Sequence, residues 1–434
     1  MQTNFSPALL ADPHMRASEK ILRSCVHCGF CTATCPTYLL LGDELDSPRG
    51  RIYLIKDMLE NDRPPSSEVV AHIDRCLSCL SCMTTCPSGV HYAHLVDHAR
   101  AYIEAKYRRP MVDRMMRAAL ARILPSAALF RLALAAGKLG RPFATILAPL
   151  PTIGPRIAAM LELVPRRVPP RLRETPRSAP AQQPPGTKRR VALLTGCAQS
   201  VLTPQTNAAA IDLLSRLSVE VVTAEGEGCC GSLVHHMGYE ARALAQARVN
   251  IDAWSREIDA GGLEAILISA SGCGTTVKDY GFMLRADPAY AEKAARIAAL
   301  AKDITEYLAT LDLKFSTASK LVVAYHSACS MQHGQKVTEQ PKVLLRNAGF
   351  IVREPAEGHI CCGSAGIYNI MQPEIASKLR ARKLRNLARV KPDVIAAGNV
   401  GCIAQIGGGA SVPVVHTVEL LNWAAGGGKP IAMG

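Results

Sequence analysis

The sequence predicts a multidomain α+β protein, in which a helical N-terminal domain precedes two copies of one α/β unit. Three observations lead to this prediction: two cysteine runs near the N-terminus, a repeat in the C-terminal half, and a proline-rich stretch between them. The chain has 434 residues, of which 48% are hydrophobic, so it can bury several cores. We expect four segments, with bounds at 1–107, 108–187, 188–315 and 316–434.

The two cysteine runs share the spacing C-x2-C-x2-C-x3-C-P, and they read CVHCGFCTATCP and CLSCLSCMTTCP. Bacterial two-cluster ferredoxins bind iron–sulfur clusters with this run. Three closely spaced thiolates wrap one corner of a cluster, and the chain then turns away at the proline, which leaves the fourth cysteine for the other cluster. A zinc site, which usually takes two C-x2-C pairs, or a disulfide framework is the alternative. We assign one [4Fe–4S] cluster to Cys25, Cys28, Cys31 and Cys86, and the other to Cys76, Cys79, Cys82 and Cys35.

Helices are expected around these runs. Asp46-Ser47-Pro48 is typical of a helix entry, so we predict a helix over 49–59. Further helices are predicted over 68–75 and in the segment that follows Pro87. The first 107 residues should therefore form a helical, ferredoxin-like domain.

The segment 108–187 holds the charge of the chain. From Arg108 to Arg190 there are 17 Lys and Arg residues against 3 acidic residues, an excess equal to the formal net charge of +14. MVDRMMRAALARIL has apolar residues at helical spacing with arginines opposite, which fits a surface helix packed on its own protein. It also fits a basic amphipathic helix that docks on anionic lipid or an acidic partner. No nucleic-acid motif accompanies the charge, so we expect no nucleic-acid partner. Seven prolines between Pro165 and Gly186 predict an extended linker.

The C-terminal half is an internal repeat. The first copy opens with KRRVALLTGC and the second with KLVVAYHSAC, and a Cys-Cys-Gly triplet follows each opening cysteine at the same distance, 32 residues on. The apolar segments EAILISASGC and DVIAAGNVGC then end on a further cysteine. Two copies of one supersecondary unit explain this pattern.

Strands and helices alternate in each copy, which predicts a small parallel sheet. The cysteines follow apolar strands, so they should gather at the carboxyl edge of each sheet, where open α/β folds hold ligands. We expect each quartet to hold a further iron–sulfur centre; buried free thiols or a redox disulfide are the alternatives. The quartets are Cys197, Cys229, Cys230 and Cys273 in the first copy, and Cys329, Cys361, Cys362 and Cys402 in the second.

Four histidines lie near these quartets, and a fifth lies in the first N-terminal run. His235, His236, His326 and His333 are expected to be structural residues with hydrogen-bond partners rather than catalytic groups or ligands. His27 lies inside the first run, where packing or hydrogen bonding beside the cluster is expected. We therefore predict no catalytic residue in this chain.

The tandem runs followed by two Cys-Cys-Gly units resemble the iron–sulfur subunits of flavin-linked dehydrogenases, which act on glycolate, lactate or glycerol 3-phosphate, and heterodisulfide reductase. The phrases ILRSCVHCGFCTATCPTYLLLGDELDSPRGRIYLIKDMLE, RRVALLTGCAQ, ASGCGTTVKDYG and HICCGSAGIY are most similar to the glycolate oxidase (glycolate dehydrogenase) iron–sulfur subunits. The resemblance covers nearly the whole chain and is weakest over 110–187. One departure is that domains of the heterodisulfide reductase type end in C-x2-C, whereas here the endings are SGCGTT and VGCIAQ.

The sequence lacks the motifs for hydride chemistry. No G-x-G-x-x-G follows a strand and no P-loop is present, so a flavin should belong to a partner subunit. The resemblance implies an oxidoreductase subunit that passes electrons from that flavin to a membrane quinone. The rival hypotheses are a lactate or glycerol-3-phosphate dehydrogenase subunit, a catalytic reductase of the heterodisulfide reductase type, and a structural scaffold.

The expected location is the cytoplasmic face of the inner membrane, with the chain bound peripherally. The first twenty residues lack a basic segment followed by an apolar core, so no signal peptide is expected. No apolar run reaches the ~18 residues of a spanning helix.

Overall fold

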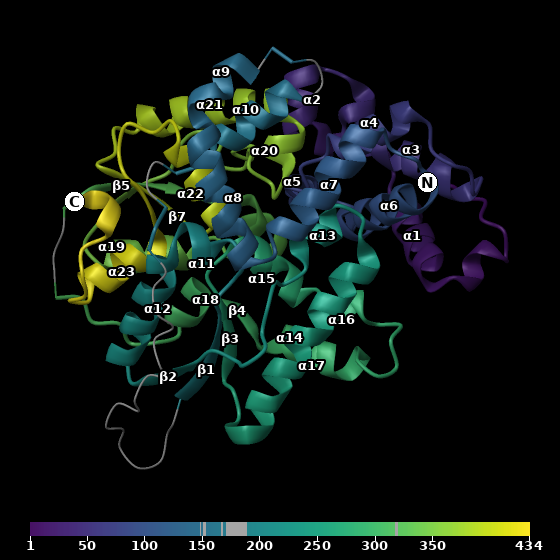
Figure 1. Ribbon diagram of the computed structural model, residues 1–434. Coiled ribbons are helices and arrows are strands. Elements are labelled where there is room, and N and C mark those ends of the chain that lie inside the picture. The colour runs from purple at the N-terminus through teal and green to yellow at the C-terminus, as the bar shows by residue number, and fades with distance from the viewer. Residues whose placement is uncertain (148, 151–152, 166–167, 171–188, 317–319) are drawn as a thin grey trace.

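The computed structural model describes residues 1–434 apart from 148, 151–152, 166–167, 171–188 and 317–319. A helical N-terminal region, a run of connecting helices and two α/β units follow one another along the chain (Figure 1). This confirms the predicted fold class. The domain bounds stay predictions, and most of the proline-rich linker lies outside the described residues.

The N-terminal region is helical around the two cysteine runs. Ser47 caps a helix that Pro48 begins, as its sequence predicts: the Ser47 side chain accepts a hydrogen bond from the Gly50 amide. The helices are α1 (Pro13–Ser24), α2 (Pro36–Leu41), α3 (Pro48–Glu60), α4 (Ser67–Asp74), α5 (Ser81–Thr85) and α6 (Tyr92–Lys106). Short 3₁₀ turns cover Leu9–Ala11, Phe30–Thr32 and Glu44–Asp46. Leu22, Ile55 and Leu95 are fully buried between α1, α3 and α6, so these helices hold the cysteine loops in place.

Four helices in the described part of the chain connect this region to the repeats. They are α7 (Met111–Ile123), α8 (Ala127–Gly140), α9 (Ala144–Leu147) and α10 (Gly154–Glu162), with a 3₁₀ turn over Arg141–Phe143. Within the described residues no single helix has the length and apolarity to cross a membrane. One pair of helices has this length and apolarity only when taken together, Met111–Ile123 with Ala127–Phe143, and the two are bent by 120° at the break between them.

Part of the basic charge of the connecting helices is structural. Arg109 is buried and donates to Asp74 and Glu104 on α4 and α6. Arg117 is buried on α7 and reaches both Glu104 and the carbonyl of Met237 in the first repeat. These arginines therefore attach the connecting helices to the protein's own surface, as the simpler of the two sequence interpretations expects.

The first repeat is a parallel sheet with the strand order β2-β1-β3-β4. The strands are β1 (Arg189–Leu194), β2 (Val219–Val222), β3 (Ala265–Ile268) and β4 (Ala301–Asp303). The helices are α11 (Gln199–Leu202), α12 (Pro204–Arg216), α13 (Ser232–His236), α14 (Glu240–Gly261), α15 (Ser271–Lys278), α16 (Tyr280–Met283), α17 (Ala291–Leu300) and α18 (Ile304–Leu308).

The second repeat has the same topology, β6-β5-β7-β8, again all parallel. The strands are β5 (Val322–His326), β6 (Ile351–Arg353), β7 (Val394–Ala397) and β8 (Val414–His416). A π-helical turn covers Ser330–Gln335, a 3₁₀ turn covers Ile431–Met433, and the helices are α19 (Gln340–Asn347), α20 (Tyr368–Met371), α21 (Pro373–Arg389), α22 (Val400–Gly407) and α23 (Thr417–Ala424). The equal strand orders confirm that the sequence repeat is a structural repeat.

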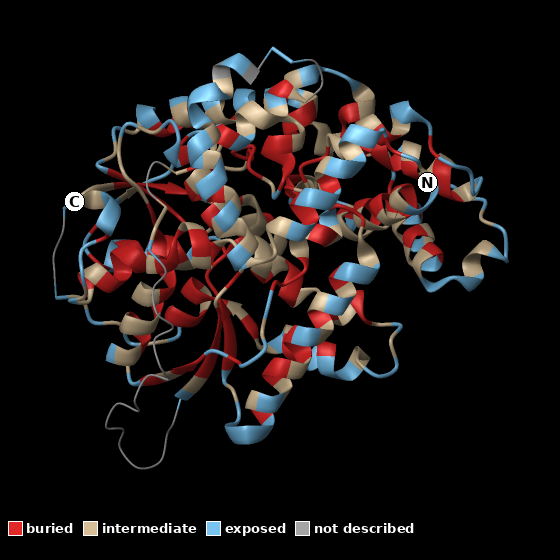
Figure 2. Cartoon of the chain, viewed as in Figure 1, coloured by how far each residue is buried: buried red, intermediate tan, exposed pale blue. Residues whose placement is uncertain are grey.

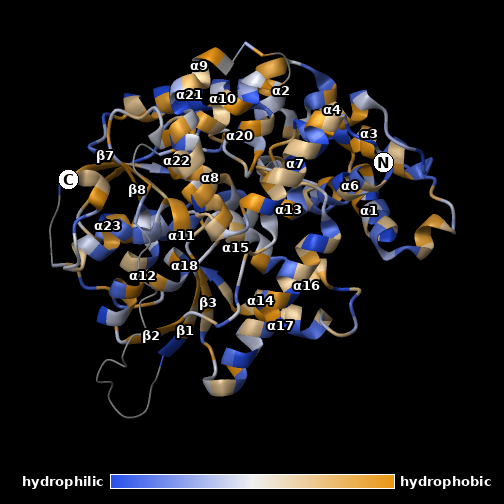
Figure 3. Cartoon of the chain, viewed as in Figure 1, coloured by the Kyte–Doolittle hydropathy of each residue, from blue (hydrophilic) through white to orange (hydrophobic). Residues whose placement is uncertain are grey.

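The two repeats share a hydrophobic core. Apolar residues from one face of each sheet, such as Val191 on β1 and Val323 on β5, belong to one buried cluster. Figure 2 shows the central strands as buried, and Figure 3 shows apolar residues along them. His416 at the end of β8 bonds the carbonyl of Ser269 beyond β3 at 2.7 Å, so the carboxyl edges of the two sheets also meet.

Candidate functional site

Cys25, Cys28, Cys31 and Cys86 line one cavity, together with Cys82. Cys25 ends α1 and Cys86 ends α5, so helix ends from both runs meet here. The loop turns through left-handed backbone at His27 and Gly29, with φ of 54° and 85°. That conformation lets the chain wrap tightly, and glycine adopts it without strain. Cys28 is exposed, which places this cavity at the surface.

Cys35, Cys76, Cys79 and Cys82 line a second cavity. The second run repeats the backbone of the first, because Ser78 and Leu80 have φ of 49° and 62° at the positions of His27 and Gly29. Left-handed backbone at a leucine costs about 1 kcal/mol or more, so the surrounding structure must hold this loop in place. Cys82 lines both cavities, which are therefore neighbours.

Buried polar groups surround the second cavity. Arg51 is 1% exposed and donates to Asp46 at 3.1 Å and to the carbonyl of His72 at 2.7 Å. Burial acts to lower the pKa of Arg51, but the nearby Cys76 and Asp46, as anions, outweigh it and raise that pKa, so the guanidinium stays charged. The Tyr92 hydroxyl donates to Cys76 Sγ at 3.7 Å. A fixed cation and a hydroxyl donor therefore face the thiols.

The first quartet of the repeats converges at the carboxyl edge of its sheet. Cys197, on the loop after β1, lies 3.5 Å from Cys229, measured between the sulfurs. Hydrogen bonds to Cys229 and Cys273, followed by burial, raise the pKa of Cys230, so all four thiols form one contact chain. Gly231 follows with φ of 88°, and a Cβ there would lie 3.0 Å from the Ala243 carbonyl oxygen.

The second quartet converges in the same way. Cys329 and Cys361 are 3.7 Å apart, and Cys362 and Cys402 are 3.5 Å apart, again between sulfurs. A hydrogen bond between Cys361 and Cys362 links the two pairs. Gly363 has φ of 90°, and a Cβ there would lie 2.6 Å from the Ala376 carbonyl oxygen, so this turn also requires glycine.

The second quartet adjoins the second cavity. Cys79 and Cys361 pack in one buried cluster with Leu77 and Tyr368, and Cys329 packs against that cluster. After burial, the negative charge of Cys329 is the largest cause that raises the pKa of Cys79. His333 binds Thr84 at 2.8 Å across the same interface. Thiols of the second cavity and of the second quartet thus share one buried cluster, and this row of thiols extends from the N-terminal region into the second repeat.

Three of the four histidines near the quartets have partners, as expected. His235 and His236 contact Asp97, and His333 contacts Thr84. His326 differs, because neither ring nitrogen has a partner among the described residues although the side chain is 1% exposed. For His326 the expectation of a satisfied structural residue is therefore wrong. His27 Nε2 is likewise buried without a partner beside the first cavity.

Lys383 is a buried charged group near the second quartet that the sequence analysis did not single out. It is 1% exposed on α21 and donates to the carbonyl of Glu357 at 2.9 Å. Burial lowers the pKa of Lys383, while the four thiols of the second quartet act to raise it, so the ammonium lies within their field. Aligning the two repeats would have revealed both His326 and Lys383, since Leu194 and Asn250 stand at the equivalent positions.

The donor chemistry suits iron–sulfur clusters. All sixteen cysteines are free thiols, and soft thiolates are the ligands of such clusters. Burial and the neighbouring cysteines raise the pKa values of Cys79 and Cys82 well above the usual range. A bound metal reverses this effect because it stabilises the thiolate form. The fold and these cysteine groups define an iron–sulfur protein with one dicluster domain and two cysteine-rich domains.

Comparisons with known proteins agree with this class. Residues 21–90 match the family described as a 4Fe-4S dicluster domain, and residues 191–278 and 323–407 each match the cysteine-rich domain. The glycolate oxidase iron-sulfur subunit of Escherichia coli K12 is 43% identical over 98% of this chain and 99% of that protein. A "probable glycolate oxidase iron-sulfur subunit" of Bacillus subtilis 168 is 31% identical over 95% of this chain and 96% of that protein. The chain belongs to the family of glycolate oxidase iron–sulfur subunits.

More distant proteins share parts of the chain or its fold. Lactate utilization protein A of Bacillus licheniformis is 27% identical over 54% of this chain and 99% of that protein. A crystal structure of a hypothetical protein from Helicobacter pylori matches with a TM-score of 0.53 at 11% identity, covering 97% of this chain and 74% of that chain. The latter supports the overall fold alone.

Proposed function

We propose that this chain is the electron-transfer subunit of a flavin-dependent glycolate dehydrogenase. Oxidation of glycolate to glyoxylate releases two electrons and two protons, which a flavin on a partner subunit takes up together. The chain accepts the electrons one at a time and passes them to a membrane quinone, which takes up two electrons and two protons. Support comes from the 43% identity that extends over almost the full length of both proteins.

The single observation that carries the proposal is the row of thiols between the second cavity and the second quartet. Iron–sulfur clusters supply one-electron transfer when bound. In this proposal Cys25, Cys28, Cys31 and Cys86 hold one [4Fe–4S] cluster, and Cys35, Cys76, Cys79 and Cys82 hold the other. The buried cluster that Cys79 shares with Cys361, and against which Cys329 packs, then brings a third centre, held by the second quartet, close to the second cluster.

The chain's own charges favour reduction of the second cluster. A reduced cluster is more negative, so a nearby fixed cation stabilises it. Arg51 supplies this cation, held in place by Asp46 and Thr37. The Tyr92 hydroxyl adds a hydrogen bond to Cys76 Sγ, which also favours the more negative state. Loss of the Arg51 cation or of the Tyr92 hydroxyl should therefore lower the reduction potential of the second cluster.

Exchange of the two fourth cysteines tests the ligand assignment. Cys35→Ser should damage the cluster of Cys76, Cys79 and Cys82, and Cys86→Ser should damage the other. Each variant should lose about four irons per chain and one of the two electron paramagnetic resonance (EPR) signals. The signal lost by Cys35→Ser should be the one whose potential Tyr92→Phe shifts. If Cys35→Ser instead removes the other signal, the crossed assignment is wrong.

The connecting helices are proposed to lie at an anionic membrane surface. Large apolar side chains are exposed there, including Met115, Leu132, Leu139 and Ile146, and exposed basic residues lie among them: Arg114, Arg122, Lys138 and Arg141. Apolar contact and attraction to anionic lipid act together at such a surface, each basic residue adding ~1 kcal/mol. Delivery of electrons to a membrane quinone favours this location.

Flotation with vesicles tests this surface. The chain should float with vesicles that contain phosphatidylserine and not with neutral vesicles, and replacing the four basic residues by glutamine should abolish flotation. The salt dependence of binding does not separate lipid from protein, because salt screens the electrostatic attraction to either one. A chain that fails to float at low salt, yet binds a flavin subunit through these helices, has a subunit-docking surface instead.

Co-purification from the native host tests the function itself. The complex should contain flavin and should reduce a quinone analogue with glycolate, and lactate and glycerol 3-phosphate should be tested beside it. Activity on lactate instead would favour the relationship to the lactate utilization protein. A flavin-containing complex without glycolate activity contradicts the proposed substrate.

A further inference from the structure

Of His235, His236, His326 and His333, only His326 has no side-chain partner among the described residues. It is the last residue of β5, at the carboxyl edge of the second sheet. The side chain is 1% exposed, and both ring nitrogens lack a hydrogen bond. Buried polar groups in proteins nearly always have partners, so an isolated imidazole indicates a ligand or a functional role.

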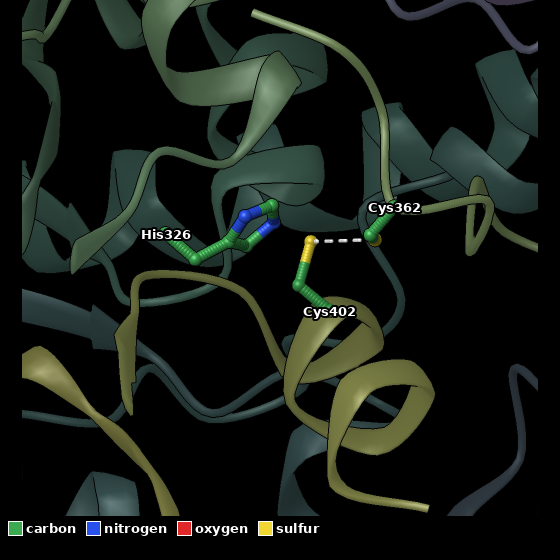
Figure 4. Close-up of side chains that lie close together, drawn as sticks. All are labelled: His326, Cys362 and Cys402. Atoms are coloured by element: carbon green, nitrogen blue, oxygen red, sulfur yellow. Dashed lines mark hydrogen bonds between the residues drawn. The ribbon is translucent and has the colours of Figure 1, made fainter. Parts of the chain in front are cut away.

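The imidazole faces two thiols of the second quartet. A ring nitrogen of His326, Cys362 Sγ and Cys402 Sγ all lie within 4.8 Å of one another, and all three residues are buried. Figure 4 shows the ring pointing at Cys402, with the two sulfurs joined at 3.5 Å. The three donors come from a strand end, a loop and the first turn of α22, so the fold brings them together independently of sequence proximity.

The first repeat has no such donor. Leu194 occupies the equivalent position, since it ends β1 and lies three residues before Cys197, as His326 lies three residues before Cys329. Both positions pair with the neighbouring parallel strand, Leu194 with Ile268 and His326 with Ala397. The difference between the two sites is therefore one of chemistry and not of backbone.

We propose that His326 is a ligand of an iron–sulfur centre held by the second quartet, which thereby combines imidazole and thiolate donors, while the centre of the first quartet has thiolates alone. The proposal rests on the proposed function in one respect, namely that the second quartet holds iron. Imidazole binds iron as a neutral donor where thiolate binds as an anion. Imidazole ligation raises the reduction potential of an iron–sulfur centre, so the second centre should be reduced before the first.

The test uses the full chain, prepared anaerobically with iron and sulfide. Pulsed EPR on the paramagnetic state of the centre detects the nitrogen-14 hyperfine coupling of a directly bound imidazole. We expect this coupling in the wild type and in the control variant His333→Gln. The His333 ring is not available as a ligand, because Thr84 and the His359 carbonyl already contact its two nitrogens. We expect its loss in His326→Leu, which copies the residue of the first repeat.

A thiolate replacement separates a ligand from a packing residue. His326→Cys should retain the iron, lose the nitrogen coupling and lower the midpoint potential of the centre, because a fifth thiolate adds negative charge. Retention of about eight irons in the ferredoxin-type clusters shows that a variant has folded.

Each outcome is decisive. Iron beyond about eight per chain, with coupling lost only in the His326 variants, supports the proposal. Iron beyond eight with no such coupling, or with coupling unchanged in His326→Leu, overturns the role of His326 while leaving the iron in the quartet. Only eight irons in the wild type, or a zinc ion that His326→Leu releases, overturns the iron–sulfur centre itself.

Discussion

The two repeats have the same strand order and the same cysteine spacing, yet their sites differ in three ways. The second quartet has a buried imidazole, His326, where the first has Leu194. A buried ammonium, Lys383, stands where the first has Asn250, which bonds the backbone at Cys229 instead. The second quartet also touches Cys79 of the N-terminal region.

This difference fits our proposal that the two copies of the repeat have different tasks. The two repeats share four parallel strands and a glycine after the paired cysteines, and this shared geometry places a group of thiols at the edge of each sheet. Substitutions beneath the thiols then change the charge of one site and not the other. The site that has the added ammonium and imidazole is also the one that adjoins the second cavity, where a raised potential would draw electrons from the cluster proposed there.

Removing one thiol from each quartet should have unequal effects. In a complex with the flavin subunit, Cys402→Ser should slow quinone reduction by at least about tenfold, or ~1.4 kcal/mol of barrier, because it breaks the row beside Cys79. Cys273→Ser is the matched variant of the first repeat and should have a smaller effect. Equal losses, measured by steady-state kinetics with unchanged flavin content, would contradict the separate tasks.

The two Cys-Cys-Gly turns should also tolerate alanine unequally. Gly363→Ala places a Cβ 2.6 Å from the Ala376 oxygen, whereas Gly231→Ala leaves 3.0 Å to the Ala243 oxygen. Both add left-handed strain of ~1 kcal/mol, and the closer contact should bring Gly363→Ala to roughly 3 kcal/mol. Denaturant unfolding of the two variants measures this difference. Similar midpoints would show that the second turn relaxes as freely as the first.

The smallest expected effect is a pH dependence confined to the first repeat. Asp97 on α6 contacts His235 and His236 there, whereas His333 and Tyr368 of the second repeat meet neutral partners in the N-terminal region, Thr84 and the Arg75 carbonyl. Burial acts to lower the pKa of His235, but Asp97 outweighs it and raises that pKa above the usual 6.5. The contribution of this contact is therefore complete below pH ~6.5 and is lost as the pH rises through the folded pKa, on the order of 1 kcal/mol.

Hydrogen exchange at the two interfaces measures this loss. Between pH ~6 and 8, after correction for the intrinsic pH dependence of exchange, amides of α13 should lose protection. Amides of the turn Ser330–Gln335 should not. Loss of protection at both interfaces would mean that the whole N-terminal region loosens.

Much of this arrangement could be predicted because it depends on local spacing. The cysteine runs determine which thiols come close, Ser47-Pro48 begins a helix, and the equal 32-residue gaps indicate a repeat. His326 was misjudged because its isolation depends on what surrounds it in three dimensions. The buried cluster that brings Cys79 and Cys329 together joins residues 250 positions apart, and no periodicity encodes such packing.

The sequence shows the positive charge of the connecting segment, but it does not show which arginines are buried and which are exposed. Arg109 and Arg117 form ion pairs and backbone contacts inside the protein, whereas Arg114 and Arg122 are exposed. Helical periodicity assigns faces, and only the packing of α7 against α6 and the first repeat shows which arginines are covered.

Anaerobic reduction by glycolate is the most direct test of the central claim, that this chain carries electrons and does not oxidise the substrate. The visible absorbance of its iron–sulfur clusters should bleach when glycolate and the flavin subunit are both present, and should not bleach with glycolate and this chain alone. Bleaching without the flavin subunit would place the oxidation on this chain. Clusters that stay oxidised while the complex still converts glycolate to glyoxylate would place them outside the electron path.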